Sequence, residues 1–264
     1  GERIKIISKI ENMEGIENFR DILEISDGIM VARGDMGVEV DFEKLPGIQK
    51  KFIKECCRAG KPVITATQML ESMTSNPAPT RAEITDVANA VFDGTSAVML
   101  SGESAAGKYP VETVETMSRI VRQAEADAEE VNQYKFLEVE SDEKDVSNAM
   151  GHAACTTARD IKASIIIAVT TSGYTAEMMS KYKPTTPIIA ATPEVKTYHQ
   201  QALTRGVYPV LTKLSNNINE LMGEACEGAK RMGFAEDGDL AVISAGMPLQ
   251  VSGTTNLIRV KVVE

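Results

Sequence analysis

Short apolar runs rich in β-branched residues recur along the first half of the chain, each followed by a polar or glycine-containing turn and a segment of helical periodicity. The runs begin at residues 4, 28, 63 and 97. Strand, turn and helix in this repeating order predict parallel β/α units. The expected strands are Ile4–Ile10, Gly28–Ala32, Val63–Ala66 and Ala97–Leu100, and the expected helices are Glu43–Ala59, Pro79–Phe92 and Pro110–Ala128.

Polar residues gather where each of these predicted strands ends. In a β/α barrel the carboxyl ends of the strands converge on one mouth, and the active site lies there. A complete barrel has eight units and typically about 250 residues, so four units do not close one. We therefore expect residues 1–128 to be the C-terminal half of a (β/α)8 TIM-type barrel, with an open sheet edge where earlier strands would pair. A half-barrel that is complete in itself is the alternative.

A second α/β pattern follows an acidic segment. Residues 125–145 carry nine acidic and two basic side chains and so contribute −7 to the net charge of −10. We therefore predict an acidic connector over residues 129–145. Residues 146–264 predict a small three-layer α/β domain. Its expected strands are Ser164–Val169, Pro187–Ala191, Val207–Leu211, Leu240–Ser244 and Asn256–Val263, and its expected helices are Val146–Ile161, Ala176–Tyr182, Glu194–Thr204 and Asn217–Met232.

Composition narrows the classes of function. The sequence has no basic cluster of the kind that binds nucleic acid, and no apolar stretch near the roughly 18 residues of a membrane span, so we expect neither partner. Four cysteines without a CxxC spacing favour a reduced, cytoplasmic protein. The chain has only two histidines, which leaves little material for catalysis by a Ser-His or Cys-His pair. The candidate catalytic groups are therefore lysines, carboxylates, hydroxyls and backbone amides. Because the chain opens on Gly1 without an initiator Met or a secretory segment, we expect a fragment or a processed form.

The first two strand ends supply a lysine and two carboxylates. Lys9 and Glu11 are two residues apart on a strand and therefore point to the same side. For this pair alone, an exposed ion pair is the alternative. Asp35 follows the next strand between Gly34 and Gly37, and glycines let a backbone approach a ligand closely. Glu11 and Asp35 are candidate ligands of one Mg²⁺, which takes one or two carboxylates and completes its shell with water and substrate oxygens.

The third and fourth strand ends add hydroxyls and a further carboxylate. Thr67 follows the third strand, and Ser101 and Glu103 follow the fourth. A metal beside a lysine, a glycine-rich turn with free amides and a hydroxyl suits a small phosphorylated carboxylic acid. Phosphoryl transfer requires electrostatic positioning more than covalent chemistry, so this is the reaction class that the strand ends favour.

The segments around these strand ends resemble the pyruvate kinase family, in the same order along the chain. Residues 6–16 (IISKIENMEGI) are similar to the active-site signature of that family. Four further segments match it: Asp27–Gly37 (DGIMVARGDMG), Gly60–Met73 (GKPVITATQMLESM), Pro79–Phe92 (PTRAEITDVANAVF) and Met99–Glu103 (MLSGE). The resemblance implies phosphoryl transfer from phosphoenolpyruvate to ADP, giving pyruvate and ATP in the last step of glycolysis. It also implies Mg²⁺ or Mn²⁺, K⁺, allosteric control and a cytoplasmic homotetramer.

The resemblance further implies roles for the matching residues. Lys9 would stabilise negative charge on the transferring phosphoryl group and on the enolate oxygen, while Glu11 and Asp35 would hold the divalent metal. The amides of Gly34 and Asp35, with the Thr67 hydroxyl, would hold the substrate carboxylate.

Three more residues match the family with less definite roles. Ser101 and Glu103 match residues near the proton route to the enolate carbon. Arg33 also matches, but the sequence gives it no chemical role, and a structural salt bridge is at least as good an interpretation.

The chain also departs from the family. Its first four barrel strands, its lid domain, its potassium ligands and most of its nucleotide-contacting basic residues have no counterpart here. We therefore predict that the chain alone has no measurable kinase activity. A regulatory module that binds effector and partner subunits is the alternative function, and a phosphoenolpyruvate-handling barrel of different reaction is disfavoured by the paired strand-end motifs.

The second domain offers a candidate anion site. Its first predicted strand runs into hydroxyl residues and a glycine before a helix, and amides at a helix N-terminus favour an anion. An ordinary N-cap is the alternative, but the family has a sugar-phosphate or nucleotide effector site in the matching loop. The candidate residues are Thr170, Thr171, Ser172, Gly173 and Thr175, with Ser252–Thr255 as a possible far wall.

Overall fold

The computed structural model describes residues 4–130, 145–249 and 255–264. The chain forms two compact units, Gly1–Phe136 and Leu137–Glu264, and each is described by itself. The division falls inside the predicted connector, whose residues 131–144 lie outside the described residues, while Glu129 and Glu130 belong to a helix. Within the described parts of the chain, no helix is both long and apolar enough to cross a membrane.

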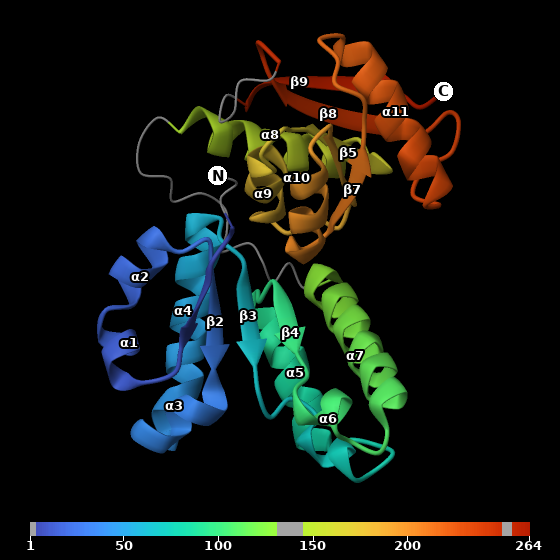
Figure 1. Ribbon diagram of the computed structural model, residues 1–264. Helices are drawn as coiled ribbons and strands as arrows, with labels where there is room; N and C mark the ends of the chain where they lie inside the picture. Colours follow the sequence, from blue (N-terminus) through green and yellow to red (C-terminus); the bar gives the residue numbers. More distant parts are fainter. Residues whose placement is uncertain (1–3, 131–144, 250–254) are drawn as a thin grey trace. The chain divides into compact units, whose positions relative to one another are not determined.

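The first unit contains a four-stranded parallel sheet in the order β1-β2-β3-β4, so that strands consecutive in the chain are neighbours in the sheet (Figure 1). Its strands are β1 (Ile7–Ile10), β2 (Gly28–Ala32), β3 (Val63–Ala66) and β4 (Ala97–Met99). Its helices are α1 (Met13–Glu17), α2 (Phe19–Ile25), α3 (Arg33–Glu39), α4 (Leu45–Ala59), α5 (Arg81–Asp93), α6 (Gly102–Ala105) and α7 (Pro110–Glu130). The order is that of successive strands in a β/α barrel.

The two faces of this sheet differ in burial. Ile10, Val31 and Thr65 are paired in register and are all fully buried. The adjacent register row, Lys9 with Met30 and Ile64, is only partly buried or exposed. Because neighbouring residues of a strand point to opposite faces, one face carries the core of the unit, while the other is less buried at Lys9, Met30 and Ile64.

Four helices of the first unit were not predicted from the sequence: α1, α2, α3 and α6. Each has seven residues or fewer, too short for an apolar period to repeat clearly. The first begins at Asn12, whose side chain accepts a hydrogen bond from the Gly15 amide at 2.9 Å. For α1 the sequence signal is therefore a cap rather than a periodicity, whereas α2, α3 and α6 begin without a side-chain cap.

The second unit has three layers around a five-stranded sheet of order β7-β6-β5-β8-β9, in which β9 is the antiparallel strand. Its strands are β5 (Ile165–Val169), β6 (Ile188–Thr192), β7 (Val207–Leu211), β8 (Leu240–Gly246) and β9 (Thr255–Val262). Its helices are α8 (Val146–Asp160), α9 (Tyr174–Ser180), α10 (Val195–Gln200) and α11 (Ile218–Arg231).

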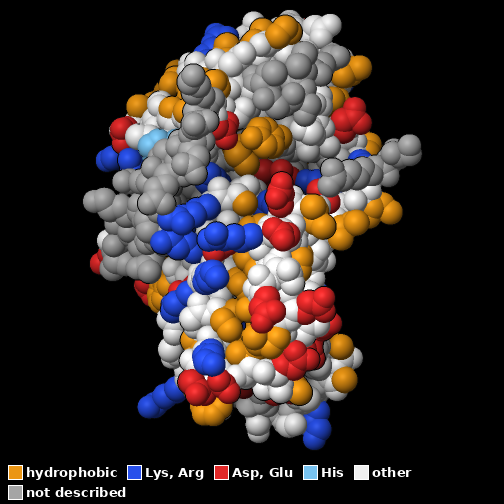
Figure 2. Space-filling model, turned by 90° about the vertical axis from the view of Figure 1, so that its left-hand side faces the viewer, with side chains coloured by type: hydrophobic (Ala, Val, Ile, Leu, Met, Phe, Trp, Pro, Cys, Tyr) orange, Lys and Arg blue, Asp and Glu red, His pale blue; other side chains and the backbone are white. Residues whose placement is uncertain are grey.

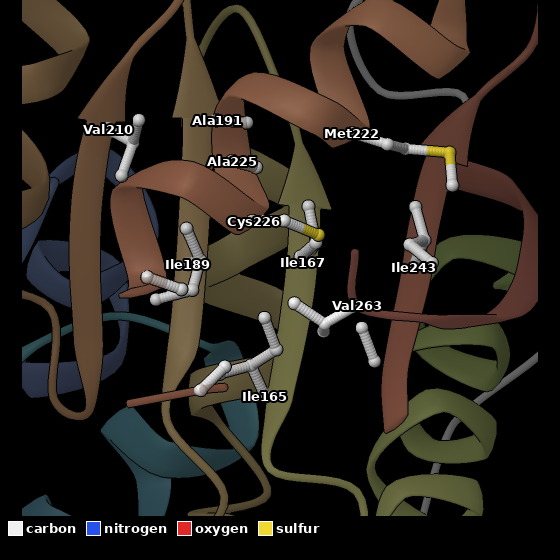
Figure 3. Close-up of a cluster of buried hydrophobic side chains, with 13 residues drawn as sticks. Ile165, Ile167, Ile189, Ala191, Val210, Met222, Ala225, Cys226, Ile243 and Val263 are labelled. Carbon is white, nitrogen blue, oxygen red and sulfur yellow. The ribbon is translucent and has the colours of Figure 1, made fainter. Parts of the chain in front are cut away.

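Alternate residues of β5 supply the two cores of this unit. Ile165 and Ile167 pack with α11, including Cys226, as Figure 3 shows. Ile166 and Ala168 belong to the opposite cluster, which contains residues of α8 and α9. A strand buried on both faces explains why this segment is a continuous apolar run in the sequence.

Two glycines of α11 give a matched test of this packing. A Cβ at Gly228 would lie 2.6 Å from Cγ2 of Val210, whereas nothing lies within 4 Å of a Cβ at Gly223. Gly228→Ala is therefore expected to destabilise the protein by ~1–3 kcal/mol through overpacking. Gly223→Ala, which adds only helix propensity, is expected to stabilise it by roughly 0.5–1 kcal/mol. Urea unfolding measures both, and equal effects of the two changes would contradict the packing of α11 on β7.

A capping box begins α5. The Thr80 hydroxyl accepts a hydrogen bond from the Glu83 amide at 3.3 Å, and the Glu83 carboxylate accepts from the amides of Thr80 and Ser72, each at 2.7 Å. Burial is the largest single influence on the pKa of Glu83 and raises it. The hydrogen bonds from Ser72 and Thr80 together outweigh burial, so the pKa of this carboxyl lies below its ordinary value.

Glu83→Gln is accordingly expected to lower the free energy of unfolding by about 1 kcal/mol at neutral pH. Since the folded-state pKa is depressed, the stabilisation is present above the unfolded-state pKa and is lost as pH falls through the folded-state pKa. The difference between wild type and variant should therefore shrink in acid, as followed by unfolding at several pH values. Glu115→Gln, on exposed α7 surface, is the control; a difference independent of pH would refute the assignment.

Candidate active site

Three charged side chains meet at the carboxyl ends of β1 and β2. The Lys9 ammonium donates a hydrogen bond to Oδ2 of Asp35 at 2.7 Å and another to Oε2 of Glu11. Lys9 lies on β1, Glu11 just beyond it, and Asp35 in the first turn of α3, which begins directly after β2. All three side chains are about half exposed, at 45, 44 and 55%. The cluster is therefore open to a ligand.

Lys9 and Asp35 shift each other's pKa. The hydrogen bond to Asp35, followed by that to Glu11, raises the pKa of Lys9 above its ordinary value. The same bond to Lys9 holds the pKa of the Asp35 carboxyl below its ordinary value. At neutral pH the site therefore contains a cation between two acids, which suits a ligand that brings both a metal and negative oxygens.

The donor set fits a hard divalent cation that keeps part of its water shell. The carboxylates of Glu11 and Asp35 both reach one nitrogen, so they can converge on one ion. Over the described ranges, no group of three or more His, Cys, Asp and Glu side chains is placed to hold a metal. Two carboxylates with open positions are typical of Mg²⁺ bound together with substrate oxygens. Binding the ion would require the Lys9 ammonium to move from between the two acids.

Residues Arg33–Glu39 form the helix α3, where the sequence suggested a glycine-rich turn. The amides of Gly34 and Asp35 are still outside the helical hydrogen bonding, because the first amides of a helix have no partner within it. The Gly34 amide instead donates to the Thr67 hydroxyl at 2.8 Å. The structure thus brings Gly34, Asp35 and Thr67 together, at the end of β3 beside the Lys9 cluster.

Arg33 forms a structural salt bridge. Its Nη1 lies 2.7 Å from Oδ1 of Asp86 on α5, and its Nη2 donates to the Thr67 carbonyl at 2.6 Å. The side chain is 13% exposed, so it does not project into the solvent beside Lys9. The interpretation of Arg33 as a structural salt bridge is confirmed, although its partner Asp86 lies too far away along the chain to be named from the sequence.

Glu103 is fully buried, and its contacts are with the backbone. Its carboxylate accepts hydrogen bonds from the amide of Ser101 at 2.7 Å and from the amide of Leu70 at 3.3 Å. It thereby joins the loop after β3 to the end of β4. Ser101 is partly exposed and precedes α6. None of the described hydrogen bonds connects either residue to Lys9, Glu11 or Asp35.

The candidate effector loop of the second unit is a compact turn between β5 and α9. The Thr170 hydroxyl accepts a hydrogen bond from the Gly173 amide at 2.9 Å. Gly173 has φ +89°, and a Cβ there would lie 2.1 Å from Nε2 of Gln201, so this position requires glycine. The Thr171 carbonyl accepts from the Thr197 hydroxyl at 2.7 Å.

The predicted far wall of this loop is only partly described. Ser252, Gly253 and Thr254 lie outside the described residues. Thr255 begins β9, and its hydroxyl shares a buried hydrogen bond of 2.9 Å with that of Thr175 on α9. Ser172 is exposed, and its hydroxyl accepts from the Tyr174 amide at 3.5 Å.

The fold and the strand-end charges define a protein of parallel β/α units that carry a lysine and two carboxylates at their strand ends, followed in the chain by a separate α/β domain. Comparison with protein families gives the particular family. The model described as "Pyruvate kinase, barrel domain" matches residues 1–114, and "Pyruvate kinase, alpha/beta domain" matches residues 148–261. The chain belongs to the pyruvate kinase family, and the prediction of barrel strands followed by an α/β domain is confirmed.

Curated relatives agree over the whole chain. Pyruvate kinase of Clostridium acetobutylicum is 51% identical over 266 residues, covering 100% of this chain and 56% of the relative. Pyruvate kinase of Lactobacillus delbrueckii subsp. bulgaricus is 50% identical, covering 98% and 44%, and that of Sporosarcina psychrophila is 47% identical, covering 100% and 45%. The chain spans about half the length of these relatives.

Proposed function

We propose that the protein containing this chain transfers the phosphoryl group of phosphoenolpyruvate to ADP, giving pyruvate and ATP. In this reaction the bond between phosphorus and the enol oxygen breaks, a bond to the terminal oxygen of ADP forms, and the enolate left behind takes a proton on carbon. Family membership supports the proposal. The observation that carries it is the Lys9 ammonium held between the carboxylates of Glu11 and Asp35.

Lys9 is proposed to stabilise the charge that develops during transfer. Its ammonium already lies among acidic oxygens in an open site, at the end of a strand whose other side is fixed by the buried Ile10. A positive group preorganised beside the enol oxygen and the phosphoryl group lowers the barrier without reorganisation at the moment of reaction. Its raised pKa keeps it charged at neutral pH.

Glu11 and Asp35 are proposed to hold Mg²⁺ or Mn²⁺. The bound ion would supply positive charge that offsets negative charge on the substrate oxygens. The family also implies K⁺, and the resemblance assigns its ligands to a part of the protein that this chain lacks. The two carboxylates orient their oxygens toward one point, and the exposure of both leaves room for substrate and water.

The substrate carboxylate is proposed to bind at the amides of Gly34 and Asp35 and at the Thr67 hydroxyl. The Gly34 amide donates to that hydroxyl at 2.8 Å, and the hydroxyl donates to the Ala66 carbonyl at 2.7 Å. The two groups therefore lie side by side, and both would turn their protons toward a bound carboxylate. Ser101 is proposed to assist the proton route to the enolate carbon. Glu103 would act by holding the Ser101 amide, since its carboxylate is fully buried.

Activity of the protein at full length tests the proposal. Turnover is measured with phosphoenolpyruvate and ADP, by coupling pyruvate formation to the oxidation of NADH with lactate dehydrogenase. We expect turnover that requires a divalent cation from the full-length protein. We expect none from residues 1–264 alone, since the family site includes strands beyond this chain. Absence of turnover at full length, with the cation present, would overturn the proposal.

A regulatory function is proposed for the second unit, whose loop after β5 would hold a phosphorylated effector. The compact turn at Gly173, closed by Gln201, supports it. Binding of fructose bisphosphate, ribose 5-phosphate and AMP is measured by calorimetry, with Ser172→Ala as the test variant. Failure of all three to bind would refute effector binding for those ligands.

Family membership supports a homo-oligomer, a tetramer as in the family. The four buried, unbridged cysteines support a cytoplasmic location.

A further inference from the structure

Two consecutive non-glycine residues adopt left-handed backbone conformations directly after β3. Thr67 has φ +71° and Gln68 has φ +54°. L side chains seldom adopt this region, and for a β-branched residue such as threonine it is a genuine outlier. Strain of this kind persists where the surrounding structure holds it, and it is concentrated at functional sites. The contacts that hold Thr67 are therefore of interest.

Arg33 holds the backbone of this turn. Its Nη2 donates to the Thr67 carbonyl at 2.6 Å, and its Nε donates to the Ala66 carbonyl at 3.4 Å. The guanidinium therefore contacts the last residue of β3 and the first left-handed residue after it. Its planar fork can make both contacts at once, which a lysine ammonium cannot do with the same geometry.

Side chains of two helices hold the guanidinium in place through Nη1, the nitrogen that does not contact the turn. Nη1 lies 2.7 Å from Oδ1 of Asp86 on α5 and 3.4 Å from Oε1 of Gln49 on α4. Gln49 is buried, and its Nε2 in turn donates to Oδ2 of Asp93 at 3.4 Å. The polar network behind Arg33 thus connects both helices to the turn after β3.

The residue after Arg33 holds the side chain of the same threonine. The Gly34 amide donates to the Thr67 hydroxyl at 2.8 Å, and a Cβ at Gly34 would lie 3.2 Å from that oxygen. Arg33 and Gly34 are consecutive in the chain and contact opposite ends of Thr67, its carbonyl and its hydroxyl. The position of the hydroxyl therefore depends on the backbone conformation that Arg33 stabilises.

We propose that Arg33, locked by Asp86, is the positioning residue that holds Thr67 in its left-handed conformation and so keeps the Thr67 hydroxyl beside the Gly34 amide. The proposal rests on the function proposed above, in which this hydroxyl and amide hold the substrate carboxylate. Arg33 does not touch the substrate. It sets the affinity for phosphoenolpyruvate through Thr67.

Kinetics of the full-length protein test the proposal first. Arg33→Met and Asp86→Asn should raise the KM for phosphoenolpyruvate by roughly tenfold to 10²-fold, because small displacements of a positioning group have effects of that size. The KM for ADP should change less than twofold. Arg33→Lys keeps the positive charge but not the planar guanidinium, so its KM for phosphoenolpyruvate should lie between those of Arg33→Met and wild type. Lys50→Met is the matched control, since Lys50 pairs with Asp93 in the same network without reaching Thr67.

A crystal structure of full-length Arg33→Met, or of Arg33→Lys if the first variant does not fold, gives a readout independent of activity. Thr67 should leave the left-handed region, and its hydroxyl should separate from the Gly34 amide. The proposal would be overturned if Thr67 kept its wild-type backbone conformation, or if the KM for phosphoenolpyruvate stayed at its wild-type value. An equal rise in this KM for Lys50→Met would also overturn it. If wild type has no kinase activity, the proposed function fails, and the position of Thr67 alone decides whether Arg33 holds it.

Discussion

Lys9→Met in the full-length protein is expected to lower kcat by about 10²–10³-fold or more, the usual scale for removing one preorganised group that stabilises charge in a transition state. The protein should lose little stability, because the bonds of Lys9 to Glu11 and Asp35 are exposed and such pairs contribute little to folding. The measurement is kcat in the coupled assay, beside urea unfolding of the same sample.

The control for this change is Lys44→Met. Lys44 forms an exposed pair with Asp41 at 2.6 Å, three residues away, and it belongs to no part of the proposed site. Its kcat should stay within twofold of wild type. Near-normal turnover in Lys9→Met would remove Lys9 from the mechanism and leave the exposed ion pair as the explanation of its contacts.

Asp35→Asn and Glu11→Gln are each expected to weaken Mn²⁺ binding by at least about tenfold. Each change removes one of two charged ligands, and even partners that merely orient a metal ligand typically contribute 10–100-fold. Electron paramagnetic resonance of free Mn²⁺ measures binding without reference to turnover.

Glu39→Gln is the matched control for the metal ligands. Glu39 is an acid on the same helix α3, but its carboxylate accepts a hydrogen bond from the Met13 amide at 3.0 Å. It should bind Mn²⁺ as wild type does. Unchanged affinity in both Asp35→Asn and Glu11→Gln would place the metal elsewhere.

The strands could be predicted well, because hydrophobic runs and their turns are local signals. Gly28–Ala32, Val63–Ala66 and Val207–Leu211 have the predicted bounds in the structure. The first strand begins at Ile7, not at Ile4, and Ile4 and Ile6 are exposed at 78 and 63%. The apolar run thus extends beyond the strand at its N-terminal end. Pairing with β2 begins only at Ile7, and this pairing could not be read from the run itself.

The meeting of Lys9, Glu11 and Asp35 could be expected from strand alternation and from parallel strands that end at one edge. Their roles remain predictions. The helix α3 could not be expected, since two glycines within Arg33–Gly37 oppose a helix by propensity, and the surrounding fold must supply the stabilisation. A structural salt bridge was one interpretation of Arg33, but its partners could not be named, because Gln49 and Asp86 lie 16 and 53 residues away in the chain.

The most direct test of the proposed site is anomalous diffraction from crystals of the full-length protein grown with Mn²⁺ and phosphoenolpyruvate. The account predicts a manganese peak at about 2.0–2.2 Å from a carboxylate oxygen of both Glu11 and Asp35, the spacing typical of a small divalent ion. It also predicts the Lys9 ammonium on a substrate oxygen. A peak away from these two carboxylates, or a Lys9 ammonium still bound between them, would contradict the account.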